Sequence, residues 1–145
     1  MLRSRRFQAP DKAEMKEIYA ISRVSLAMIW FYHGLIPKLL FASPQEVRMN
    51  NELIPFLSEK AALSITGGME VLYALSLLVF YKSKVLLYPS MAFIVIATVS
   101  LFVKFPDLFQ DAFNPFSINL AVIALSVINL MAAPGKVGPE PQGNI

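Results

Sequence analysis

Four long apolar stretches separated by short polar segments dominate the hydrophobic pattern of the chain. They cover residues 18–41, 61–81, 85–103 and 116–133. A helix of about 20 residues spans the roughly 30 Å hydrocarbon layer of a bilayer, and each stretch is close to that length. The pattern therefore predicts an all-α integral membrane protein, a four-helix bundle in which each stretch crosses the membrane once.

The polar segments between the stretches predict how the helices connect. Residues 81–84 allow only a tight turn, so we expect the second and third helices to be antiparallel neighbours. The first connection is the longest and carries the start signals of a helix of its own. Ser43 is its N-cap, Pro44 its first residue and Glu46 its capping-box carboxylate. These signals predict a short interfacial helix in the first outer loop, and an ordered loop without function is the alternative.

The two ends of the chain differ in composition from the apolar region. Residues 1–17 carry five of the Lys and Arg residues and predict a basic arm, whereas residues 134–145 are rich in proline and glycine and predict a flexible tail. The membrane domain between them is residues 18–133. Apart from Arg23 inside the first stretch, eight basic residues fall on the side of the termini and four on the other side. The positive-inside rule then predicts that both termini are cytoplasmic.

Composition narrows the class of protein further. The chain has 145 residues, 56% of them hydrophobic, and a mean hydropathy of +0.55, which is too apolar and too short for a soluble multidomain enzyme. It has no cysteine, which excludes disulfides, thiol relays and thiolate-held metal or iron–sulfur centres within the chain. Glycine-rich nucleotide loops are absent, and the single histidine argues against a metal site. A basic arm beside a membrane helix is far commoner than a nucleic-acid arm, so we predict no nucleic-acid partner.

Ionisable groups inside the apolar stretches are the candidate functional residues. Arg23, His33 and Lys38 lie in the first stretch and Glu70 lies in the second. An ionisable group near the bilayer centre costs about 2.5 to 3.5 kcal/mol on insertion scales, so these groups need partners. With a rise of about 1.5 Å per residue, Glu70 and His33 lie at similar depth. Arg23 lies nearer the cytoplasmic side and would reach Glu70 only by extending along its helix.

Two interpretations of these polar groups remain open. In the functional one, the first two helices enclose a polar pocket for a proton, a quinone headgroup or another small ligand. Its lining residues are Trp30, His33, Glu70 and Tyr73. In the structural one, buried polar groups only specify the register of the helices. The intramembrane polar residues concerned are Arg23, Lys38, Glu70, Asn119 and Asn129.

Three segments of the chain resemble the DoxX-like family of small four-helix bacterial membrane proteins. They read SRVSLAMIWFYHGLIPKLLF at 22–41, ITGGMEVLYALSLL at 65–78 and NPFSINLAVIAL at 114–125. Some members of that family are linked to thiosulfate:quinone oxidoreductase or to redox and thiol homeostasis complexes, so the resemblance implies a role beside membrane redox chemistry. The chain departs from a redox-active member because it has no cysteine and no cofactor motif. Any electron transfer would then occur on a partner or on a bound quinone.

Together, the residues and the resemblance favour a non-catalytic membrane subunit or scaffold that docks a redox protein at its basic cytoplasmic face. On this interpretation the chain is not an enzyme on its own, and it has no catalytic residues and no cofactor. Two alternatives are a binder of a small hydrophobic ligand such as quinone and a proton-coupled carrier that uses Glu70. Four helices would have to dimerise to form a carrier path, so a homo-oligomer belongs to that alternative.

Overall fold

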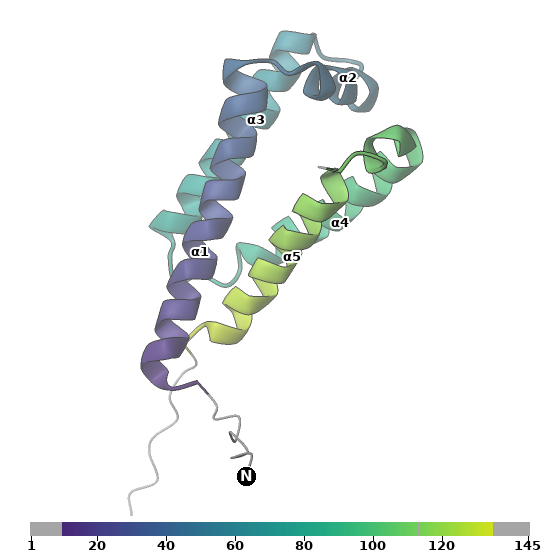
Figure 1. The fold of residues 1–145 in the computed structure, drawn as a ribbon. Coiled ribbons are helices and arrows are strands. Elements are labelled where there is room, and N and C mark those ends of the chain that lie inside the picture. Colours follow the sequence, from purple (N-terminus) through teal and green to yellow (C-terminus); the bar gives the residue numbers. More distant parts are fainter. Residues whose placement is uncertain (1–9, 113, 135–145) are drawn as a thin grey trace, which may run out of the picture.

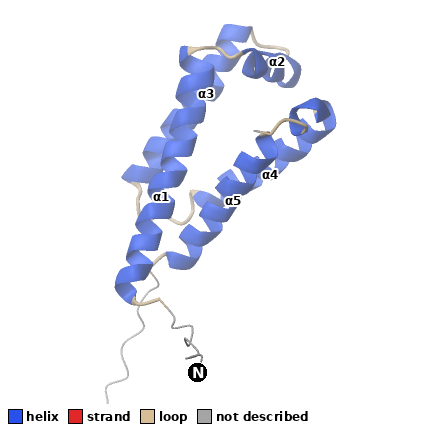
Figure 2. Ribbon diagram, viewed as in Figure 1, coloured by secondary structure: helices blue, strands red, loops and turns tan. Residues whose placement is uncertain are grey.

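A computed structural model of the chain describes residues 10–112 and 114–134, and every regular element in these residues is a helix (Figure 2). The four long helices are α1 (Lys12–Gly34), α3 (Glu59–Val79), α4 (Leu87–Lys104) and α5 (Pro115–Ala132). Three short helices connect them: a π-helical segment η1 (Leu35–Leu40) that continues α1, α2 (Pro44–Leu53), and the 3-10 helix η2 (Pro106–Phe109) after α4. The predicted all-α class is confirmed.

Side-chain caps determine where the helices begin. The Asp11 carboxylate accepts hydrogen bonds from the backbone N–H groups of Ala13 and Glu14, and the Glu14 carboxylate accepts one from the N–H of Asp11. This capping box starts α1 inside the segment predicted as a basic arm. The rest of that arm and nearly all of the predicted flexible tail lie outside the described residues.

Three of the described helices, α3, α4 and α5, are long and apolar enough to cross a membrane. A fourth candidate span is reached when α1 with η1 is counted together with α2, from which it is bent by 93°. The predicted multi-pass membrane character is therefore confirmed by length and composition, with three to four candidate spans.

The long helices are arranged as two pairs that diverge toward one end of the molecule. α3 packs along α1, α4 packs along α5, and α1 also contacts α5 (Figure 1). We call the end that carries α2 and η2 the α2 end, and the opposite end, where α3 finishes, the Arg23 end. The predicted side-by-side packing of the second and third helices is wrong, because residues 80–86 form a longer connection than a tight turn and α4 turns to pack along α5.

One apolar cluster joins all four long helices on the inner side of this arrangement. It consists of Leu26, Ala27 and Trp30 from α1, Ala74 and Leu77 from α3, Leu87 and Ile94 from α4, and Val122 from α5. Most other large apolar side chains of α3, α4 and α5 are exposed. An exposed apolar surface of this extent is typical of helices solvated by lipid.

The backbones of α1 and α3 touch at two glycines. A Cβ atom added to Gly34 would lie 2.5 Å from the carbonyl oxygen of Gly67, and one added to Gly67 would lie 2.8 Å from the carbonyl oxygen of Gly34. Without side chains, the two helices approach closely, as small residues allow in membrane proteins. Gly68, the next residue, has open space where a Cβ would be.

We predict that Gly34→Ala destabilises the protein by about 1 to 3 kcal/mol, because the added methyl group forces the two backbones apart. Gly68→Ala is the matched control and should leave the free energy of unfolding unchanged or raise it by up to about 1 kcal/mol, since alanine favours a helix. Unfolding in a mild detergent measures both values. Equal effects of the two substitutions would contradict the close approach.

Candidate functional site

Arg23 is fully buried, with 0% of its surface exposed, and its guanidinium binds the end of α3. Its Nε donates to the carbonyl oxygen of Leu77 at 3.0 Å, and its Nη2 donates to the carbonyl oxygens of Phe80 and Ser83, each at 2.9 Å. The last carbonyl groups of a helix have no partner within it and carry partial negative charge. Arg23 therefore caps the C-terminus of α3 from a neighbouring helix.

Asn129 extends this contact from α3 to α5. Its Oδ1 accepts a hydrogen bond from Arg23 Nη1 at 3.4 Å, and its Nδ2 donates to the Tyr19 carbonyl oxygen at 2.9 Å and to Ser22 Oγ at 2.8 Å. Both Asn129 and Ser22 are buried. Three chain segments thus share one satisfied polar cluster, which we call the Arg23 cluster.

Of the three ionisable residues in the first apolar stretch, Lys38 is the one that pairs with Glu70. Arg23 is bound at the Arg23 end, and the Glu70 carboxylate pairs instead with the Lys38 ammonium at the α2 end. Within residues 10–112 and 114–134, no hydrogen bond joins His33 to Glu70. The predicted similarity in depth of these two residues therefore does not bring them into a polar contact.

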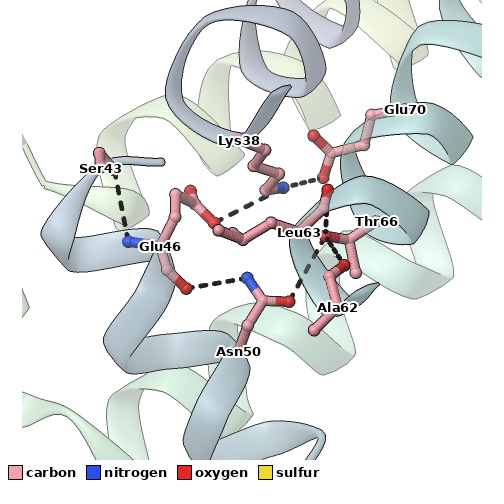
Figure 3. A network of polar contacts seen from close by, with 8 residues as sticks. All are labelled: Lys38, Ser43, Glu46, Asn50, Ala62, Leu63, Thr66 and Glu70. Carbon is pink, nitrogen blue, oxygen red and sulfur yellow. Dashed lines mark hydrogen bonds and ion pairs between the residues drawn. The ribbon is translucent and has the colours of Figure 1, made fainter. Parts of the chain in front are cut away.

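The Lys38 ammonium also lies 3.7 Å from Oε2 of Glu46, which comes from α2 (Figure 3). The Lys38 side chain is 10% exposed, and each of the two glutamate side chains is 15% exposed. We call these three residues the Lys38 triad. It brings together η1, α2 and α3, and it places one cation between two carboxylates in a largely buried position.

Local contacts hold α2 in this place. Ser43 Oγ accepts a hydrogen bond from the Glu46 N–H at 3.4 Å, as its predicted N-cap role requires. The Glu46 carboxylate was predicted to complete a capping box, but it contacts the Lys38 ammonium instead. Asn50 donates to the Glu46 carbonyl oxygen at 2.8 Å and accepts a longer bond of 3.4 Å from Thr66 of α3.

Burial is the main influence on the acidity of Glu46. It raises the pKa of Glu46, the nearby Lys38 ammonium lowers it, and the Glu70 carboxylate raises it again. The net direction is upward, so Glu46 holds its proton more strongly in this position than in water.

The four predicted ligand-binding residues differ in their surroundings. Trp30 and Tyr73 are in edge-to-face contact, with ring centroids 5.0 Å apart, and Trp30 is 7% exposed within the apolar cluster. The Tyr73 hydroxyl donates to the carbonyl oxygen of Leu86 at 2.9 Å. His33 is half-buried, and its ring centroid lies 6.3 Å from that of Tyr32.

Two surface hollows lie away from these residues. One, of about 380 Å³, follows the outer groove between α1 and α3, and the other, of about 430 Å³, lies between α4 and α5 near η2. None of Trp30, His33, Glu70 and Tyr73 lines either hollow. Two buried polar atoms in the described part of the chain lack a hydrogen-bond partner, however: Trp30 Nε1 and Glu70 Oε2.

Asn119 joins α4 to α5, since its Nδ2 donates to Thr98 Oγ1 at 2.8 Å. With Asn129 in the Arg23 cluster, both asparagines of α5 make contacts between helices. These contacts agree with the structural interpretation, in which polar groups fix helix register. In the described part of the chain, no group of three His, Cys, Asp or Glu side chains is placed to hold a metal ion.

A second ionic contact of α2 was missed in the sequence. Arg48 binds both carboxylate oxygens of Asp107, at 2.6 and 3.2 Å, and lies over the Phe105 ring at 5.0 Å from its centroid. The hydrogen bonds from Arg48 hold the pKa of Asp107 below its usual value. No spacing rule predicts this pair, because the two residues are 59 positions apart and lie in different elements, α2 and η2. The prediction that both connections lie on one side of the membrane was the only signal in the sequence.

Comparison with protein-family models shows a match over residues 27–127 to the family described as DoxX-like. The matched region contains Trp30, Lys38, Glu70 and both contacts of α2. Comparisons with curated proteins and with solved structures find no match.

We predict that Arg23→Met strongly destabilises the protein, by about 3 kcal/mol or more, because it leaves buried carbonyl groups and Asn129 without their donor. Arg48→Met is the matched control: this arginine is half-exposed, so its loss should change the unfolding midpoint little. Thermal unfolding in detergent measures both. If the two variants had the same unfolding midpoint, the Arg23 cluster would not have the role assigned to it.

Proposed function

The chain belongs to the DoxX-like family, and we propose that it is a non-catalytic membrane subunit or scaffold associated with redox or quinone-linked metabolism. The observation that carries this proposal is the engagement of its buried charges. Arg23 is bound to backbone carbonyls and Asn129, and Glu70 is paired with Lys38. Side chains that are used in this way support helix packing, which is a structural role rather than a catalytic one.

The absence of cysteine from the whole chain agrees with a supporting role. Electron transfer linked to this protein would take place on a partner or on a bound quinone. The basic residues near the N-terminus and in the α3–α4 connection suit a redox protein with an acidic surface that docks on the cytoplasmic face.

The membrane arrangement that we propose is a four-helix unit in the bacterial inner membrane, with α1 and η1, α3, α4 and α5 each crossing once. α2 then lies at the outer interface. The exposed Leu53 and Phe56 at and just after its end support this position, because apolar side chains there can enter the lipid boundary. The eight basic residues on the side of the termini, against four on the other side, support cytoplasmic termini.

A second candidate function is the binding of a small hydrophobic ligand such as quinone. It is favoured by the two buried atoms without partners, Trp30 Nε1 and Glu70 Oε2. Unsatisfied buried polar groups are rare in proteins, and a polar headgroup that reached both helices would supply the missing hydrogen bonds. The same carboxylate would serve the proton-coupled carrier, which is the third alternative.

The proposed topology predicts the behaviour of reporter fusions. A fluorescent protein that matures only in the cytoplasm should fluoresce when it is fused after residue 145, and alkaline phosphatase should be inactive there. Fusions after residue 58, within the first outer connection, should give the opposite result. An active phosphatase at residue 145 would reverse the orientation.

Extraction of the purified protein separates the scaffold from the ligand binder. We expect no stoichiometric quinone in protein that is isolated in mild detergent from quinone-containing membranes. Stoichiometric quinone would instead favour the ligand binder. In that case Trp30→Phe, which keeps an aromatic ring but removes the indole N–H donor, should lower the quinone content. Tyr88→Phe, at an exposed position of α4, should leave the quinone content unchanged.

A further inference from the structure

Three charged contacts, which differ in burial, hold α2 to the rest of the protein. On one side, Glu46 enters the largely buried Lys38 triad. On the other, Arg48 pairs with Asp107, with both side chains about half-exposed, and the Lys104 ammonium donates to the Glu52 carbonyl oxygen at 3.4 Å. α2 thus connects the α1–α3 pair with the end of α4 across the α2 end, where the two helix pairs diverge (Figure 1).

The charges of the Lys38 triad do not balance when both carboxylates are ionised. One ammonium then faces two carboxylates and leaves a net charge of about −1 at a site with little access to water. Burying an uncompensated charge is expensive, so one bound proton stabilises the triad. Glu70 Oε2, which is buried and has no hydrogen-bond partner among the described residues, is one oxygen that can carry this proton.

The other charged groups around the triad do not supply the missing positive charge. On α2, Arg48 is turned to Asp107. On α1, His33 forms no ion pair with either glutamate of the triad in the described part of the chain. On α3, the neighbouring polar group is Thr66, which is neutral and donates to the Ala62 carbonyl oxygen. A proton is therefore the simplest way to neutralise the triad.

We propose that α2 is a strap over the α2 end whose docking on α3 is controlled by one proton held between Glu46 and Glu70. With the proton bound, the triad is neutral and α2 stays docked. When the proton leaves, the two carboxylates repel each other and Glu46 moves toward water. The first half of α2 then leaves α3, and the exposed Arg48 pair is too weak to hold it there.

The direction of the pH dependence follows from Glu46. Docking buries this group and raises its pKa, so the docked state binds the proton more strongly than the released state does. Docking is therefore favoured at low pH and weakens as the pH rises through the raised pKa. Each pKa unit gained on docking corresponds to about a tenfold change in the docking equilibrium.

The residue before the N-cap of α2 is suited to act as a hinge. Ala42 has a φ of 44°, in the left-handed region that residues other than glycine rarely adopt. Such a conformation persists only while the surrounding contacts hold it. Release of α2 would let Ala42 relax to an ordinary backbone conformation.

The experiment uses pairs of spin labels on the full chain in lipid nanodiscs, where the natural lack of cysteine makes labelling specific. Labels at Asn51→Cys and Lys82→Cys report the position of α2 relative to the far end of α3. Labels at Lys60→Cys and Lys82→Cys report α3 alone. All three positions are exposed. We expect the first distance distribution to shift and broaden as the pH rises, while the second stays constant.

Neutral variants identify the group that titrates. Glu46→Gln and Glu70→Gln each leave one carboxylate for Lys38, so α2 should stay docked at every pH. Glu52→Gln, an exposed position of α2 outside the triad, should titrate as the parent does. At a pH at which α2 is docked, infrared spectra of the unlabelled protein should show a carboxylic acid C=O band. This band should be lost in both triad variants and kept in Glu52→Gln.

Three results would overturn the proposal. They are a distance distribution of the parent that does not change with pH, a pH response that survives in Glu46→Gln, and a missing carboxylic acid band. The infrared measurement requires no engineered cysteine, so it decides the protonation state even if a labelled variant folds poorly.

Discussion

A buried guanidinium that must find hydrogen-bond acceptors within the membrane is the constraint on which the rest of this structure depends. Arg23 has no surface exposed to solvent or lipid, and its acceptors are carbonyl oxygens at the end of α3 and in the connection that follows. Those carbonyls would otherwise also be unsatisfied. These hydrogen bonds satisfy both the buried guanidinium and the carbonyl groups at the end of α3. They also fix α1 against α3 and, through Asn129, against α5.

The α2 end is held by weaker and more varied contacts. The glycine contact keeps α1 and α3 together up to Lys38, but α4 and α5 diverge from them beyond the apolar cluster. α2 bridges this gap mainly through ionic and polar contacts, several of them exposed. The protein therefore has buried, satisfied contacts at the Arg23 end and more exposed contacts at the α2 end, which suits the proposed pH-controlled docking of α2.

Much of the fold was predictable because lipid imposes simple rules on sequence. The length of the apolar stretches indicated the long helices, and Ser43 and Pro44 indicated α2. The pairing of charges was not predictable to the same degree. Arg23 binds backbone carbonyls, which every residue has and no sequence pattern marks. Because Arg23 is bound at the end of α3, the Glu70 carboxylate pairs with Lys38 instead.

The hydrophobic pattern also did not predict that α3 and α4 diverge, because the second apolar stretch (61–81) continues past Val79, where α3 ends. The roles of the predicted ligand residues, the partners and the orientation in the membrane stay predictions. Trp30 and Tyr73 contact each other, Trp30 within the apolar cluster and Tyr73 packed against it.

The long-range character of the Arg23 cluster has a consequence for biosynthesis. The acceptors of Arg23 follow it in the sequence by 54 residues at Leu77, 60 at Ser83 and 106 at Asn129, so they are synthesised after α1. During that interval the first helix carries an unpaired positive charge that hydrocarbon does not tolerate, so it must wait beside water, the translocon or lipid headgroups. α1 then reaches its final depth only after α3 and α5 have been synthesised. Assembly of the protein therefore depends on the order in which its helices are made.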